Sequence, residues 1–265
     1  MFPVLLKLGP VTIYSFGVML AVGFWLWLFL AWRRLKELGL VEEKLLDMLI
    51  LSTALGAFFA WGVYRFEYFF YRGASWWGGV AGLVLVVWGF SKKERWDFWQ
   101  ILDEVVYALV PFTVVFNLGL FLDGFGGGKP TSLPWGIFYP GILYRSHPLT
   151  LYSAVFFFLV WLIVLKVERD WRSWPWLKER KNGFIFLFYA IASSIFGLGI
   201  VFLSLNDIYW RWIRFGLGGT VLAAAAVLMV LRVDIWPKKN RLKKQRQLRL
   251  KGKEINKVAE VRNPR

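Results

Sequence analysis

Seven long stretches without any charged residue interrupt this 265-residue chain. They are residues 8–32, 48–64, 73–91, 105–122, 146–165, 182–206 and 215–231. A helix needs roughly 20 mainly apolar residues to cross a bilayer. Hydrophobic residues make up 58% of the chain, which is more than ordinary soluble domains contain. We therefore predict an all-α integral membrane protein with seven transmembrane helices in one domain over residues 1–236. A six-helix alternative stays open because the Gly-rich stretch 73–91 is the weakest.

Composition also excludes several classes of protein and of site. The chain has no Cys and a single His, so a disulfide framework, a Cys metal site and a multi-His metal centre are all excluded. We expect neither a metal nor a cofactor. The first apolar stretch is preceded only by Lys7 and lacks a basic leader and a cleavage site, so we interpret it as a retained first span.

The distribution of positive charge predicts the orientation of the helices. If the seven stretches alternate in direction, 26 of the 33 Lys and Arg residues fall on one side and seven on the other. Lys and Arg concentrate in loops that stay in the cytoplasm. We therefore predict a multi-pass protein of a bacterial plasma membrane, with the N-terminus outside and the C-terminus in the cytoplasm.

The last segment, residues 237–265, holds 12 Lys and Arg against two Glu. We expect a basic, disordered cytoplasmic tail that binds anionic lipid of the inner leaflet, because each basic residue near such a surface contributes about 1 kcal/mol. Nucleic acid is not an expected partner.

One loop differs from the other connections, namely residues 123–145 between the fourth and fifth stretches. It is rich in Gly and Pro and yet strongly apolar, and irregular backbone at membrane depth must be packed in protein or line a cavity. We predict a structured loop on the outer face. Beyond it, Ser146 is a plausible N-cap and Pro148 suits the first turn of a helix. Arg145 and His147 would then lie at a helix N-terminus, which favours anions such as a lipid phosphate; the alternative is that His147 only caps or packs.

Three segments of the chain resemble the prolipoprotein diacylglyceryl transferase family. The longest is the loop, which reads Gly119-x-Phe121-x-Asp123-Gly124-x-x-x-Gly128-Lys129-Pro130-Thr131-x-Leu133-Pro134-Trp135-Gly136-x-x-Tyr139-Pro140-Gly141 and continues with Arg145-Ser-His147-Pro148-x-x-Leu151-Tyr152. The other two are Gly9-Pro10-Val-x-Ile13-Tyr-Ser-Phe16-Gly17 and Trp77-Gly78-Gly79-x-x-Gly82. The resemblance covers the whole chain except the tail.

The resemblance implies seven spans and an activity at the outer leaflet. Members of the family transfer a diacylglyceryl group from phosphatidylglycerol to the Cys thiol of a prolipoprotein signal peptide, and glycerol phosphate leaves. Phosphatidylglycerol and prolipoprotein signal peptides are therefore the expected partners. His147 is the candidate catalytic residue, and the expected substrate-binding residues are Arg145, His147, Tyr152, Lys129, Asn117 and Asp123.

The chain also departs from the family pattern at its charged positions. The family's Arg, Glu and His fall at Asn117, Phe125 and Trp77, and residues 194–206 of the sixth stretch carry no charge where the family has several. Two hypotheses follow: an active transferase, or a catalytically impaired relative that binds lipid or signal peptide without transfer. Arg211 and Arg214 are either part of a displaced phosphate site or interfacial anchors.

Overall fold

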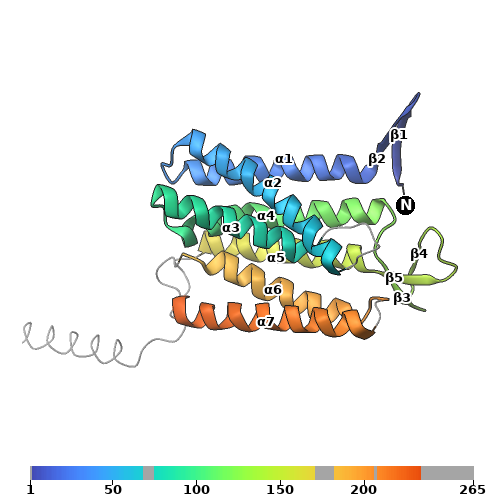
Figure 1. The fold of residues 1–265 in the computed structure, drawn as a ribbon. Helices are drawn as coiled ribbons and strands as arrows, with labels where there is room; N and C mark the ends of the chain where they lie inside the picture. The colour runs from blue at the N-terminus through green and yellow to red at the C-terminus, as the bar shows by residue number, and fades with distance from the viewer. Residues whose placement is uncertain (1, 68–74, 171–181, 206–207, 234–265) are drawn as a thin grey trace, which may run out of the picture.

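The protein is an up-and-down bundle of helices (Figure 1). The computed structural model describes residues 2–67, 75–170, 182–205 and 208–233. Within these ranges seven helices coincide with the seven predicted stretches, and six of them are long and apolar enough to cross a membrane. The helices are α1 (Ser15–Lys36), α2 (Glu42–Glu67), α3 (Trp76–Glu94), α4 (Phe98–Leu122), α5 (Leu149–Asp170), α6 (Phe184–Val201) and α7 (Ile208–Val233). The predicted tail, residues 237–265, lies outside the described residues.

Helix α3, which occupies the weakest of the seven stretches, 73–91, is long enough but is not among the six candidate membrane spans. Its last turn carries Lys92 and Lys93, and its interior is rich in glycine. The structure thus shows a helix at each predicted position, with six clear candidates for membrane spans.

The chain begins with a β-hairpin that the sequence patterns did not predict. Strand β1 (Val4–Leu8) pairs antiparallel with β2 (Val11–Tyr14). Gly9 adopts the left-handed conformation, with φ +58°, in the turn between them, which glycine reaches without steric cost. The expectation of a first helix beginning at residue 8 is therefore wrong, because the chain reverses at Gly9–Pro10 and α1 starts only at Ser15.

Three further strands form a small sheet at the same end of the bundle, on the right in Figure 1. They are β3 (Gly127–Pro130), β4 (Ile137–Phe138) and β5 (Arg145–Pro148). Strand β5 lies in the middle and pairs antiparallel with both neighbours. We call this end of the bundle the sheet end. The Gly- and Pro-rich loop of residues 123–145 therefore contains regular backbone pairing.

Helices α2 and α3 approach each other closely through glycine. A Cβ atom on Gly78 would lie 2.6 Å from the carbonyl oxygen of Phe59, and one on Gly82 would lie 2.7 Å from that of Leu55. Small residues at this spacing let helix backbones pack directly in an apolar environment. The Gly-Gly-x-x-Gly segment of α3 is thus explained by its contact with α2.

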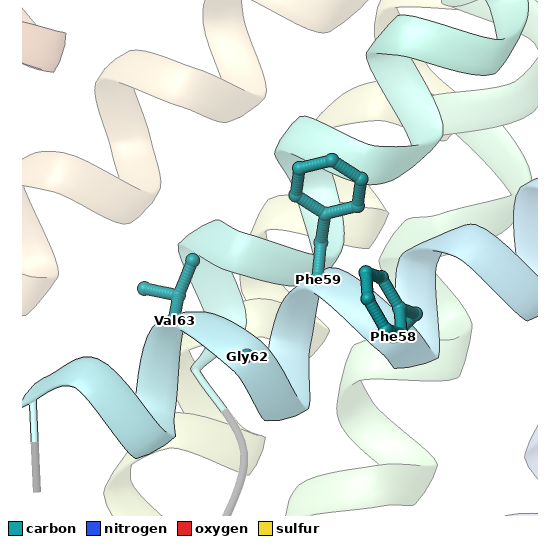
Figure 2. A pocket seen from close by; sticks show the side chains of 4 residues that line it. All are labelled: Phe58, Phe59, Gly62 and Val63. Atoms are coloured by element: carbon teal, nitrogen blue, oxygen red, sulfur yellow. The ribbon is translucent and has the colours of Figure 1, made fainter. Parts of the chain in front are cut away.

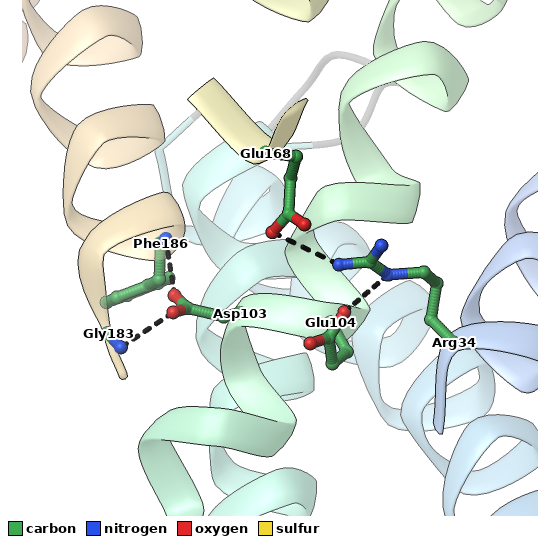
Figure 3. A network of polar contacts seen from close by, with 6 residues as sticks. All are labelled: Arg34, Asp103, Glu104, Glu168, Gly183 and Phe186. Atoms are coloured by element: carbon green, nitrogen blue, oxygen red, sulfur yellow. Dashed lines mark hydrogen bonds and ion pairs between the residues drawn. The ribbon is translucent and has the colours of Figure 1, made fainter. Parts of the chain in front are cut away.

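The opposite end of the bundle is tied together by a cluster of ion pairs (Figure 3). The Arg34 Nε atom of α1 lies 2.6 Å from Glu104 Oε2 of α4, and its Nη2 atom lies 3.1 Å from Glu168 Oε1 of α5. The guanidinium also stacks over the Tyr107 ring, 4.3 Å from the ring centre. Because Glu104 is only 2% exposed, this arginine supplies the charge that its burial requires. We call this end the ion-pair end.

A second buried carboxylate, Asp103, caps helix α6. Its two oxygens accept hydrogen bonds from the backbone N–H groups of Gly183, at 2.7 Å, and Phe186, at 2.9 Å. These N–H groups have no partner within the helix, and a negative charge at a helix N-terminus is stabilising. Asp103 therefore fixes where α6 begins relative to α4.

A Gly82→Ala substitution tests the close contact of α2 and α3. The added methyl group would clash with backbone atoms of α2, so we expect a loss of about 1–3 kcal/mol of stability, measured as a lower Tm in detergent. Gly89→Ala in the same helix is the matched control, because a Cβ atom there meets nothing within 4 Å. Equal Tm values for the two variants would contradict the proposed packing.

An Arg34→Met substitution tests the ion-pair cluster. Removing one partner of a buried charge pair costs about 3–5 kcal/mol, so thermal unfolding of the variant should begin at a markedly lower temperature. Arg33→Met is the neighbouring control, because Arg33 and Glu37 form an exposed pair of a kind that contributes about 0–1 kcal/mol. If Arg33→Met were the more damaging change, the cluster would not hold the helices together.

Candidate functional site

Strand β5 presents two of the predicted site residues on one face. Successive side chains of a strand point to opposite faces, and the exposure of β5 follows this alternation. Arg145 is exposed and His147 is half-buried, whereas Ser146 and Pro148 are buried. Arg145 and His147 therefore share the outward face of the central strand at the sheet end.

The His147 imidazole is held by a short chain of hydrogen bonds. Its Nδ1 atom lies 3.1 Å from the hydroxyl oxygen of Tyr152, which is in the first turns of α5. The same hydroxyl oxygen accepts a hydrogen bond from the indole Nε1–H of Trp135 at 2.9 Å. Tyr152 was predicted as a site residue, but Trp135 was not. Its only signal in the sequence was its place in the Leu-Pro-Trp-Gly part of the resemblance.

Arg145 carries a positive charge that the described part of the chain does not neutralise by an ion pair. Its guanidinium lies 5.6 Å from the centre of the Phe138 ring on β4, and its carbonyl oxygen accepts a hydrogen bond from the Thr131 backbone N–H at 2.9 Å. An arginine offers a planar, permanently charged fork that matches phosphate oxygens. Arg145 and His147 are thus suited to bind an anion.

The other predicted substrate-binding residues lie on β3 and in the last turns of α4 or at its end. Lys129 lies on β3, next to β5, and its backbone N–H donates to the Leu203 carbonyl at 2.8 Å. The Asn117 side chain donates to the Thr113 carbonyl one turn earlier in α4, at 2.8 Å. Asp123 forms the C-terminal cap of α4. No hydrogen bond or ion pair of the described residues joins Asn117 or Asp123 to Arg145 or His147.

The expected helix start at Ser146 and Pro148 is wrong. Both residues belong to β5, and α5 begins at Leu149. Ser146 is fully buried, and its hydroxyl donates to the Ile137 carbonyl at 3.4 Å instead of capping a helix. Pairing with β3 and β4 holds this segment extended. Arg145 and His147 therefore lie on the strand that leads directly into α5 and do not occupy the first turn of the helix.

Tight contacts beneath the strands support the exposed face. Gly126 has φ +91°, and a Cβ atom there would lie 2.4 Å from the Thr150 side chain. The Thr150 hydroxyl donates to the Phe125 carbonyl at 3.0 Å, and the Leu149 N–H donates to the Gly126 carbonyl at 3.0 Å. These bonds fix the start of β3 against the start of α5, where Tyr152 is located.

The buried Tyr139 ring packs against Gly127 at the start of β3. The side chain is 4% exposed, and its ring is so close to Gly127 that a Cβ atom there would lie 3.1 Å away. Burial raises the pKa of Tyr139 above its ordinary value. The phenol therefore stays neutral and does not supply a negative charge near Arg145.

Aromatic side chains occupy the interior near the positions where the family pattern has charges. Phe16 of α1 meets Phe116 of α4 edge-on at 5.7 Å, and Phe116 also packs on Phe112 and on Trp76 of α3. Trp77 is half-buried and Phe125 is 59% exposed. The space between α1, α3 and α4 is thus filled by rings at the sheet end.

The hollow drawn in Figure 2 shares no residue with the predicted site. It has a volume of about 310 Å³ and is lined by Phe58, Phe59, Gly62 and Val63 of α2. All four residues are apolar and none is a predicted site residue. The hollow therefore provides no polar chemistry, and the face of β5 remains the candidate site.

The predicted alternative at the head of α7 is described only in part. Arg214 is half-buried on this helix, and the side chain of Arg211 lies outside the described residues. A displaced phosphate site there remains a hypothesis.

A Gly126→Ala substitution tests the support beneath the strands. The new side chain would have to adopt a left-handed backbone conformation, at a cost of about 1–3 kcal/mol, and would clash with Thr150. We expect faster proteolysis within residues 130–141 in the variant. Gly197→Ala is the control, because a Cβ atom there meets nothing within 4 Å. Unchanged cleavage in Gly126→Ala would show that this contact does not order the sheet.

Known proteins are similar in sequence to most of this chain. A family profile described as prolipoprotein diacylglyceryl transferase matches residues 3–233. A phosphatidylglycerol–prolipoprotein diacylglyceryl transferase from Chromohalobacter salexigens is 27% identical over an alignment of 259 residues that covers 89% of this chain and 92% of the relative. The protein of the same name from Clostridium tetani is 28% identical over 216 residues, covering 75% and 82%. That from Pseudomonas fluorescens is 28% identical over 249 residues, covering 81% and 86%.

The family profile spans all seven helices and all five strands described above. Its extent and the six long apolar helices together identify a multi-pass membrane protein of bacterial type. The chain belongs to the prolipoprotein diacylglyceryl transferase family.

Proposed function

We propose that this protein transfers a diacylglyceryl group from phosphatidylglycerol to the lipobox Cys thiol of a prolipoprotein signal peptide. The observation that carries the proposal is the shared outward face of Arg145 and His147 on β5. These residues lie in a segment that resembles the family's Arg-His-Pro with Ser146 inserted. The names of the relatives specify phosphatidylglycerol and prolipoprotein as substrates.

The reaction needs a group that stabilises a leaving phosphate. The thiol sulfur forms a bond to the diacylglyceryl carbon that carries the phosphate, the C–O bond at that carbon breaks, and glycerol phosphate leaves with the bonding electrons. The thiol proton passes to the leaving phosphate, so the total charge is unchanged. Arg145 neutralises the phosphate oxygens, and His147 contributes a hydrogen bond. Donors aimed at developing charge are among the largest contributions to catalysis.

The orientation that fits this reaction places the sheet end outside the plasma membrane. Seven spans, with α3 as the third, put the N-terminal hairpin and β3–β5 outside and the ion-pair end in the cytoplasm. Support comes from the charge distribution, because 26 of the 33 Lys and Arg residues then face the cytoplasm. The tail, residues 237–265, would bind anionic lipid of the inner leaflet.

Reporter fusions test this orientation. A reporter after Arg265 should be active only in the cytoplasm, and one inserted at Thr131 only outside it. Insertion after Gly39, between α1 and α2, serves as an internal control and should give the same result as Arg265. The same reading at Thr131 and Arg265 would exclude the seven-span arrangement.

A second function is favoured by the uncharged residues at the family's charged positions. Asn117 turns to its own helix backbone, and Trp77 and Phe125 are aromatic, so these positions supply no charge to a leaving phosphate. A chain of this kind would bind phosphatidylglycerol or a signal peptide without transfer. The two functions share the binding step and differ in whether a thioether is formed.

A transfer assay with purified protein separates the two functions and tests the site. Protein in nanodiscs containing phosphatidylglycerol is incubated with a lipobox peptide, and the diacylglyceryl adduct is measured by mass spectrometry. We expect the adduct with the wild type, and a rate lower by about 10²–10³ in Arg145→Ala. Loss of a charge-assisted contact should also weaken lipid binding by about 1.5–3 kcal/mol, with a smaller loss in His147→Ala.

Arg65→Ala is the matched control, because Arg65 is an exposed arginine in the last turn of α2, at the sheet end. Lipid binding without any adduct would support the non-catalytic function. Binding that survives Arg145→Ala but is lost in Arg211→Ala would move the phosphate site to α7 and refute the assignment to β5.

A further inference from the structure

The hydrogen bonds around His147 have a defined direction. An indole N–H can only donate, so the Tyr152 oxygen accepts the bond from Trp135. The hydroxyl proton of Tyr152 is then left for another acceptor. Among the described residues its only remaining hydrogen-bond partner is His147 Nδ1.

This direction determines which nitrogen of the ring carries the proton. In a neutral imidazole one nitrogen is a donor and the other an acceptor. If Nδ1 accepts the Tyr152 proton, Nε2 carries the ring proton and points away from the chain of bonds. His147 then offers an N–H donor on the same face of β5 as the Arg145 guanidinium.

We infer that Trp135 and Tyr152 are positioning residues that hold His147 in the Nε2–H tautomer, so that it donates to a phosphate oxygen beside Arg145. The inference deepens the proposed transfer function and rests on it for the identity of the phosphate. It also assigns a role to His147: the ring acts as a hydrogen-bond donor and not as the base that removes the thiol proton.

The geometry separates this role from simple packing. The His147 and Tyr152 rings are 6.0 Å apart and tilted by 60°, so they do not stack face to face. Their contact is made through the hydroxyl and the ring nitrogen. Trp135 is 56% exposed, so its indole contributes little to a core, and its defined contact is the bond to Tyr152.

The sequence makes a direct test possible because His147 is the only histidine in the chain. Protein labelled with ¹⁵N-histidine therefore gives the two ring-nitrogen signals of a single residue. The full chain is measured in neutral nanodiscs at a pH at which the ring is neutral, and a blocked free histidine in the same buffer gives the intrinsic tautomer ratio. We expect the ratio of the Nε2–H to the Nδ1–H tautomer of His147 to be about fivefold higher than in free histidine, because one net hydrogen bond stabilises the Nε2–H form.

Two variants interrupt the chain of hydrogen bonds, Tyr152→Phe at both bonds and Trp135→Phe at one. Tyr152→Phe deletes the hydroxyl, and Trp135→Phe deletes the donor while keeping an aromatic ring. Both should shift His147 towards the ratio of free histidine, and Tyr144→Phe, an exposed tyrosine of the same loop, should leave it unchanged. An Nδ1–H tautomer in the wild type would overturn the inference, as would an unchanged ratio in both variants.

Titration with phosphatidylglycerol completes the test. We expect the Nε2 signal of the wild type to shift with lipid concentration, and Tyr152→Phe to need about fivefold more lipid for the same shift. A tautomer as expected together with no adduct in the transfer assay would refute transfer but support the positioning role. Normal formation of the adduct by a protein whose His147 is in the Nδ1–H form would support transfer and refute the positioning role. The two proposals can therefore fail separately.

Discussion

The fold depends on how a mostly apolar bundle accommodates a few buried charges. Helix α4 carries two adjacent acidic side chains, and each has a specific partner from another helix. Glu104 is neutralised by Arg34 of α1, which also reaches Glu168 of α5, and Asp103 caps α6. Because a buried charge without a partner is costly, these contacts fix three helices around α4. Alternative registers of the helices would leave at least one carboxylate unpaired.

The same central helix carries the candidate site at its other end. From the end of α4 the chain enters the three-stranded sheet, whose glycines bring β3 close to Thr150 and to the end of α6. This packing leaves one face of β5 exposed, with Arg145 and His147 on it. The protein thus separates two kinds of charge. Those at the ion-pair end are mutually satisfied and structural, whereas Arg145 has no ion-pair partner among the described residues and is available to a ligand.

Sequence patterns predicted the helices well and their ends poorly. A stretch free of charges stops at the first ionisable residue, but α1, α4 and α5 extend beyond their stretches and include Arg34, Glu104 and Glu168, which neutralise one another. Which charge meets which is a property of tertiary packing that one sequence does not reveal. The N-terminal hairpin was missed because β1 opens with three consecutive apolar residues and so lacks the alternation that indicates a strand. At the site, Arg145 and His147 share one face of β5 and His147 contacts Tyr152, whereas no hydrogen bond or ion pair of the described residues joins Asn117 or Asp123 to them. Trp135 was missed because its partner lies 17 residues away.

The central claim is that the face of β5 binds the phosphate of phosphatidylglycerol. The most direct measurement is a structure of the protein determined in nanodiscs with a saturating concentration of this lipid. We predict that phosphate oxygens lie at about 2.7–3.2 Å from the Arg145 guanidinium and from His147 Nε2, with the acyl chains directed along the helices. A lipid phosphate held at the head of α7, with the β5 face empty, would contradict it.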